Sequence, residues 1–221
     1  MFSIYRVYGF LSAHFRARRL QWFRFVISPT SGSSVLDVGG YPWIWLEAGL
    51  PLKVTLLNPH ILPDLPAQFG DRFEFIVGDG CKLDYSDKRF DVVFSNSVIE
   101  HVGTYDQQRA FAAEARRVGV ALWIQTPARE FFIEPHLLAP FFHFLPRSLQ
   151  SRITRYGTVW GLLTKPNPAQ VEDFINGIRL LSYAEMKELF PDCEILRERW
   201  LGFTKSYVAV RTLGPTSSRR P

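Results

Sequence analysis

Short apolar runs bounded by turn-forming residues recur along the chain, at the length typical of strands buried in a parallel sheet. They predict seven strands, at residues 35–38, 53–57, 73–77, 90–95, 118–125, 193–200 and 203–211. Only Leu201 and Gly202 separate the last two runs, so we expect these strands to pair as an antiparallel hairpin. The first five are far enough apart in sequence to pair in parallel.

Helical patterns alternate with these strands. Pro42 suits the first turn of a short helix after the first strand, and residues 105–117 have the spacing of a helix. Ser182, followed three residues later by Glu185, indicates the capped start of a helix over 183–190. This alternation predicts an α/β fold with a doubly wound, mostly parallel seven-stranded sheet and an antiparallel last strand.

The alternation stops after the fifth strand. Residues 128–170 are rich in proline and aromatic side chains, and we interpret them as a helical insertion on the substrate side. A basic and aromatic segment with a predicted helix at 14–27 precedes the first strand. The chain thus divides into an N-terminal helical segment, a main domain that includes the insertion, and a disordered tail: residues 1–32, 33–212 and 213–221.

The composition is that of a globular protein, since 47% of the residues are apolar and 21% are charged. No apolar run reaches the roughly 18 residues of a membrane-spanning helix, and Arg6 interrupts the N-terminus too early for a secretory signal. The two cysteines, Cys81 and Cys193, lack the spacing of metal ligands. We therefore expect a reduced, cytoplasmic protein with no metal site.

The net charge of +5 is concentrated at the N-terminal end. Asp37 is the first acidic residue, and the arginines before it account for the excess, so no nucleic-acid partner is expected. Residues 1–28 have two interpretations. They form a peripheral contact with an anionic membrane, their aromatic side chains buried in it, or they form a helix that closes a ligand pocket.

Polar residues stand at the ends of successive predicted strands. Asp37 ends the first strand, and Gly39 and Gly40 after it allow a ligand to approach the backbone closely. Asn58 ends the second strand 21 residues later, and Asp79 follows the third strand after another 21 residues. Because ligands bind beyond the carboxyl ends of parallel strands, these residues predict one binding site at this edge of the sheet.

Four segments in order along the chain resemble the successive motifs of class I S-adenosylmethionine-dependent methyltransferases: Val35–Gly39, Gly78–Gly80, Phe90–Val93 and Val98–His101. The most similar type is the small-molecule branch, which includes the type 11 and ubiquinone-biosynthesis O-methyltransferases. The resemblance covers residues 33–126. It implies a Rossmann-like methyltransferase sheet and S-adenosylmethionine as the cofactor.

The resemblance also implies the cofactor contacts. The turn after the first strand would bind the methionine moiety, the end of the second strand the ribose, and the turn after the third strand the adenine. The end of the fourth strand would lie beside the sulfonium. The residues at these four positions are, in order, Asp37, Gly39, Gly40 and Tyr41; Asn58; Asp79, Gly80 and Cys81; Ser95, Asn96 and Ser97.

Two positions depart from the family pattern. The family turn has glycines where Tyr41 and Trp43 stand here, which places bulky side chains near the cofactor. Asn58 replaces the usual acidic residue, so the stronger, charge-assisted hydrogen bond to the ribose is lost. Tyr41 also breaks the G-x-G-x-x-G fingerprint of dinucleotide-binding enzymes, which counts against a nicotinamide cofactor.

Methyl transfer from a sulfonium is an in-line displacement, and a hydroxyl acceptor also needs a base. His101 follows the fourth strand and is the first candidate for this base, with Glu100 to orient it. His136, in the insertion, is a second candidate base or acceptor contact. The alternative for each is a structural role, in which the histidines pack at the surface and Glu100 caps a helix.

The sequence therefore predicts a methyltransferase that acts on a small acceptor, apolar or lipid-linked, with O-methylation favoured. It predicts a cytoplasmic location, with membrane association if residues 1–28 bind lipid. The altered turn and Asn58 support a second function, a non-catalytic or degenerate cofactor-binding scaffold of the same fold. An RNA methyltransferase ranks third, because Ser95–Val98 lacks the base-holding N/D-P-P-Y/F motif.

Overall fold

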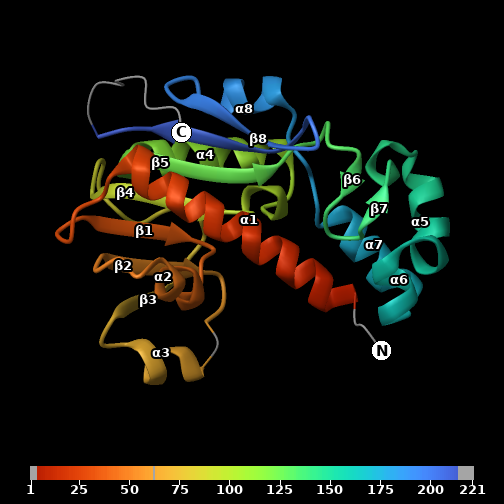
Figure 1. Cartoon of the computed structure of the whole chain (residues 1–221), viewed down its shortest axis with the longest axis horizontal. Coiled ribbons are helices and arrows are strands. Elements are labelled where there is room, and N and C mark those ends of the chain that lie inside the picture. Colours follow the sequence, from red (N-terminus) through yellow and green to blue (C-terminus); the bar gives the residue numbers. More distant parts are fainter. Residues whose placement is uncertain (1–3, 62, 214–221) are drawn as a thin grey trace. The chain divides into compact units, whose positions relative to one another are not determined.

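The computed structural model describes residues 4–61 and 63–213, with side chains from Phe15 onward (Figure 1). Apart from Leu213, the predicted disordered tail lies outside the described residues. None of the described helices is both long and apolar enough to cross a membrane.

Seven strands form one sheet in the order β3-β2-β1-β4-β5-β9-β8 (Figure 1). β1 pairs in parallel with β2 and β4, and β2 pairs in parallel with β3. Leu201 and Gly202 join β8 to β9 with φ angles of 49° and 84°, the conformation of a tight hairpin turn. The predicted doubly wound sheet with an antiparallel end is confirmed. The strands are Ser34–Val38 (β1), Lys53–Asn58 (β2), Phe73–Val77 (β3), Phe90–Asn96 (β4), Gly119–Pro127 (β5), Glu194–Trp200 (β8) and Phe203–Arg211 (β9).

The chain divides into two compact units, described separately below. The first unit comprises residues 1–96, 114–124 and 210–221, and the second comprises residues 97–113 and 125–209. The helices of the first unit are α1, α2 and α3, at Ile4–Ile27, Pro42–Ala48 and Asp64–Phe69.

Aromatic rings fill the core of the first unit. Phe23 of α1 is fully buried and contacts Trp45, Phe94 and Trp123 edge-on, at centroid distances of 5.9, 5.2 and 5.6 Å. Aromatic side chains bury large areas, and edge-to-face pairs add roughly 0.5–1.5 kcal/mol each beyond that burial. These contacts fix α1 and α2 against the strands that carry the predicted cofactor residues.

The N-terminal helix is longer than predicted. α1 begins at Ile4 and not at residue 14, because the intervening segment has no proline and Gly9 weakens a helix by only about 1 kcal/mol. Four apolar side chains of its described half are buried, namely Phe15, Leu20, Phe23 and Ile27, whereas Phe25 is 49% exposed. For residues 15–27 this burial favours a helix packed in the protein over one on a membrane. The side chains of residues 1–14 lie outside the described part.

The insertion after β5 forms a short hairpin and a set of helices in the second unit. They pack on one apolar cluster, made by Leu137, Ala139, Phe142, Val171 and Ile175. The predicted end of the insertion, residue 170, falls inside α7, whose start is fixed by a capping box between Asn167 and Gln170. The elements are β6 (Ile133–Glu134), β7 (Ala139–Pro140), η2 (Phe142–Phe144), α5 (Arg147–Gly157), α6 (Val159–Thr164) and α7 (Pro168–Asn176).

The described residues form three further helices. The predicted cap before the last helix is confirmed, since Ser182 Oγ accepts a hydrogen bond from Glu185 N, and Glu185 Oε2 accepts one from Ser182 N. These helices are η1 (Ile99–His101), α4 (Tyr105–Val118) and α8 (Tyr183–Leu189).

Candidate functional site

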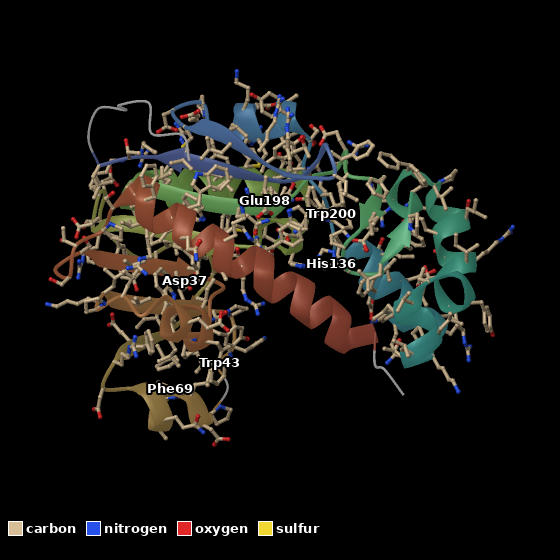
Figure 2. The ribbon with its side chains drawn as sticks, viewed as in Figure 1. Asp37, Trp43, Phe69, His136, Glu198 and Trp200 are labelled. Atoms are coloured by element: carbon tan, nitrogen blue, oxygen red, sulfur yellow. The ribbon has the colours of Figure 1, made fainter. Side chains whose placement is uncertain are left out.

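The turn after β1 is built around a buried carboxyl group. Asp37 is fully buried, and Trp45 Nε1 donates a hydrogen bond to its Oδ2 at 2.7 Å (Figure 2). Burial raises the pKa of Asp37 to about 7, and the hydrogen bond from Trp45 lowers it in part. Asp37 Oδ1 has no hydrogen-bond partner among the described residues. A buried oxygen without a partner is costly, and a cationic ligand group would satisfy it.

A cavity of about 220 Å³ opens beside this turn in the first unit. Five predicted cofactor residues line it: Asp37, Gly39, Gly40, Tyr41 and Asn96. Small-molecule sites usually start at about 300 Å³, so this cavity suits one part of a cofactor and not the whole of it. The methionine moiety is the part that the family resemblance assigns to this turn.

The bulky residues of the turn do not fill the cavity. The side chains of Tyr41 and Trp43 are 38% and 49% exposed, and Trp43 packs edge-on against Phe69 of α3 at 5.5 Å (Figure 2). The departure from the family glycines therefore leaves space beside Asp37.

Asn58, at the end of β2, is hydrogen-bonded to the turn after β1. It is buried, and its Nδ2 donates to the Gly40 carbonyl oxygen at 2.8 Å, while Gly39 N donates to Leu57 O. Gly39 has a φ of 80°, which favours glycine. The Nδ2 group of Asn58 thus donates to the protein, and its side-chain oxygen Oδ1 is left for the predicted ribose contact.

Gly40 allows no side chain, since a Cβ built there would lie 1.7 Å from Asp37 Oδ2. Gly40→Ala is expected to displace the carboxylate from Trp45 and to weaken S-adenosylmethionine binding by about tenfold, measured by isothermal titration calorimetry. Gly32→Ala is the control, because a Cβ at Gly32 meets nothing within 4 Å. Wild-type affinity in Gly40→Ala would contradict this account of the turn.

The predicted adenine residues form a separate turn after β3. Asp79 Oδ1 accepts a hydrogen bond from Cys81 N at 2.8 Å, and the Asp79 side chain is exposed. Gly78 N donates to Asn58 O, so the turn begins next to the end of β2. Among the described residues that line the 220 Å³ cavity, none comes from this turn, which includes Gly80. The adenine contact stays a prediction.

The end of β4 has one buried hydroxyl and one half-buried polar group. Ser95 is buried and donates to Val38 O, which joins β4 to β1. Asn96 lines the cavity, and its Oδ1 accepts a hydrogen bond from Arg19 of α1 at 2.9 Å. The sequence analysis did not assign Arg19 or Trp45 to the site, because neither lies at a strand end.

The three predicted catalytic side chains come together within the second unit. Glu100, His101 and His136 each have a nitrogen or oxygen atom within 4.8 Å of the others, and the two imidazole rings are 4.9 Å apart. His136 Nδ1 is 2.8 Å from Glu134 Oε1, and Glu100 Oε2 accepts a hydrogen bond from Thr126. Glu134 was not predicted. It stands two residues before His136 in a Glu-Pro-His sequence, which is its only sequence signal.

The two histidines differ in their protonation. Burial and the neighbouring charge of His136 lower the pKa of His101. Burial also lowers the pKa of His136, but the hydrogen bond and charge of Glu134 outweigh this and raise it above its ordinary value. His136 is therefore the member of the pair that carries a proton more readily, and His101 is the neutral base.

The same side chains are the set among the described residues that could hold a metal ion. Two imidazoles and one carboxylate suit several divalent transition metals, and Glu134 would fix the ring orientation of His136. The sequence analysis predicts no metal site, because His101 and His136 are too far apart in sequence to show a ligand spacing. Ser97, the last predicted cofactor residue, donates to Gln125 Oε1 in this unit.

Comparison with known proteins adds a family match. Residues 55–120 match the family model of a methyltransferase domain. No curated protein matches the chain. A candidate zinc-dependent alcohol dehydrogenase from Rhodobacter sphaeroides has a similar fold, with a TM-score of 0.58 and 13% identity over 87% of this chain and 88% of that one. A SAM-dependent methyltransferase from Methanosarcina mazei is also similar, with a TM-score of 0.53 and 16% identity over 82% of this chain and 92% of that one. A candidate sarcosine dimethylglycine methyltransferase from Galdieria sulphuraria is also similar (0.52, 16%, 86% and 63%).

The family match and the sheet order agree with the predicted class of protein. The matched residues run from β2 through β4 and α4 to the start of β5, the part of the sheet that carries the second, third and fourth strand-end positions. The matched segment is that of a methyltransferase domain, as the sequence predicts, and S-adenosylmethionine is the cofactor that this match implies. Asp37 Oδ1 and the cavity beside the Gly39–Gly40 turn fit the cationic methionine end of that cofactor. The ubiquinone-type branch stays a prediction.

Proposed function

We propose that this methyltransferase acts on a hydroxyl group of a small, largely apolar acceptor, and that His101 removes the hydroxyl proton. The observation that supports the proposal is the His101–His136 pair. The centroids of the two rings are 4.9 Å apart, and Glu134 is hydrogen-bonded to His136. A neutral hydroxyl is a poor nucleophile, and a base that takes its proton in the transition state contributes roughly 10²–10⁴-fold.

In this mechanism the two units contribute residues with different roles. S-adenosylmethionine, when bound, supplies the electrophilic methyl group. In the first unit, Asp37 and the turn at Gly39 and Gly40 hold the methionine end. In the second unit, neutral His101 would accept the proton of the acceptor hydroxyl as that oxygen receives the methyl group. His101 is partly buried but keeps a solvent-exposed part, so its proton can pass to water before the next turnover.

The test uses the full chain, methyl-labelled S-adenosylmethionine and matched acceptors that differ only in the receiving group: a phenol, an aniline and a thiophenol on the same ring. We expect a labelled methyl ether and S-adenosylhomocysteine from the phenol. Methylation of the aniline alone would overturn the proposed O-methylation. Turnover that EDTA abolishes and a divalent cation restores would replace proton removal by His101 with metal-assisted deprotonation.

The scaffold interpretation leads to a different result in the same experiment. A protein of that kind binds S-adenosylhomocysteine in calorimetry but forms no labelled product with any acceptor. An RNA methyltransferase would label RNA and leave the small acceptors unchanged.

A further inference from the structure

A cavity of about 300 Å³ lies within the second unit, between the hairpin β6–β7, the start of α5 and the end of α7. This volume is at the lower end of the range for small-molecule sites. Its wall combines polar groups with apolar side chains, among them Leu137, Phe142, Phe174, Ile175, Ile178 and Leu180. The body of its ligand should therefore be a ring or a short apolar chain.

Three arginines also line this cavity, and a carboxylate neutralises only one of them. Arg179 forms an ion pair with Glu185. Arg147 donates to two uncharged oxygens, and no carboxylate of the described part of the chain pairs with Arg147 or Arg129. The cavity thus carries two solvent-exposed guanidinium groups that no carboxylate of the described residues pairs with.

The other polar groups of the wall leave these charges in place. Glu134 is occupied, since one of its oxygens contacts His136 and the other accepts a hydrogen bond from Leu137 N. His143 Nε2 lies 2.8 Å from Arg129 O, which can only accept, so Nδ1 of the neutral ring is itself an acceptor. Within the described residues this buried Nδ1 has no partner, and as a neutral acceptor it does not offset the charges of the arginines.

We propose that this cavity binds the methyl acceptor, and that the acceptor is a small hydroxylated carboxylic acid whose carboxylate is held by Arg129 and Arg147. The proposal rests on the proposed function and adds the substrate class. A planar carboxylate matches the fork of a guanidinium. A singly charged carboxylate fits better than a phosphoryl group, because one nitrogen of the Arg147 guanidinium already donates to the carbonyl oxygen of Ile175.

The cavity also adjoins the candidate base within the same unit. Glu134, in its wall, holds His136, and the backbone nitrogen of Arg179, also in its wall, donates to Glu100 O at 2.8 Å. A ligand that fills the cavity therefore lies next to side chains that position the His101–His136 pair.

The test is calorimetric binding to the full chain saturated with S-adenosylhomocysteine. The probes are 3-(4-hydroxyphenyl)propanoate, its primary amide and the corresponding phosphonate, which differ only in the group offered to the arginines. We expect the acid to bind about tenfold more tightly than the amide, the effect of a charge-assisted hydrogen bond.

Matched variants assign this preference to residues. Arg147→Gln and Arg129→Gln should each weaken binding of the acid by about tenfold and leave binding of the amide unchanged. Arg155→Gln is the control, because Arg155 lies on the same helix and stacks on Tyr156 outside the cavity wall. All three variants should keep the wild-type affinity for S-adenosylhomocysteine and the wild-type melting temperature.

Equal binding of acid and amide, or an acid preference that survives in both arginine variants, would overturn the inference. Tighter binding of the phosphonate would reassign the cavity to a phosphoryl ligand and overturn the carboxylate. A different result would overturn the proposed function itself. Methylation of a neutral phenol without any acid preference removes only this inference, whereas the absence of transfer to any hydroxyl removes the proposed function.

Discussion

Asp37→Ala is expected to weaken S-adenosylmethionine binding by about 100-fold, because it removes a buried carboxylate from the wall of the cofactor cavity. Asp37 is fully buried, lines the cavity and has one oxygen without a partner among the described residues. S-adenosylhomocysteine should lose a similar factor, since it shares the ammonium group of the methionine end.

The measurement is calorimetric titration of both cofactors, with the melting temperature as a check on folding. Asp71→Ala is the matched control, because Asp71 is exposed in the turn before β3. A loss of less than threefold in Asp37→Ala would mean that the carboxylate serves only the Trp45 hydrogen bond and does not hold the cofactor.

The same carboxyl group also predicts a pH dependence. Its pKa rises from 3.8 to about 7 on folding, so between these values the folded protein keeps a proton that the unfolded chain releases. The free energy of unfolding from this group should therefore fall as the pH rises from 4 to 7, and Asp37→Asn should abolish that fall. Cofactor affinity should change in the opposite direction and rise from pH 6 to 7.5, because the cation selects the ionised form. Urea unfolding and calorimetry at these pH values measure both, and a flat wild-type profile would contradict the burial argument.

The strands could be predicted closely from the sequence. Every predicted strand begins and ends within two residues of the observed one, because each apolar run has the length of a buried strand and ends at a turn-forming residue. The start of α1 was wrong by ten residues, since nothing near residue 14 begins a helix. The insertion was predicted to be helical, but the bounds of its individual helices were not, because its prolines and exposed aromatics obscure the helical period.

The positions of the site residues were predictable, but their partners were not. Parallel strands end at one edge of a sheet, so Asp37 and Asn58 could be expected there. That Asn58 gives its amide group to Gly40, and that Trp45 binds Asp37, depends on side-chain orientations across separate elements. Local sequence patterns do not encode such orientations, and the two free charges of the second cavity were invisible for the same reason.

His101→Ala is expected to lower kcat by roughly 10²–10⁴-fold without changing the affinity for S-adenosylmethionine, the effect of losing a general base. The measurement is the methyl-transfer rate with the phenolic acceptor, together with cofactor titration. His60→Ala is the control, because His60 is exposed in the loop after β2. An equal rate in His101→Ala would transfer the role of base to another group or remove it.

Glu134→Gln tests how the base is tuned. Glu134 raises the pKa of His136, and the charge of His136 lowers the pKa of His101. Without the carboxylate, His136 loses its proton at lower pH and its repulsion of His101 disappears. Glu134 also raises the pKa of His101 directly, but this effect is smaller than that of His136, so the pKa of His101 rises towards its ordinary value. The acidic limb of the kcat/KM profile should therefore move to higher pH, because His101 must be neutral to accept a proton. A structural role for Glu134 would lower the rate at every pH without moving that limb, so the position of the limb decides whether the His101–His136 pair works as a coupled base.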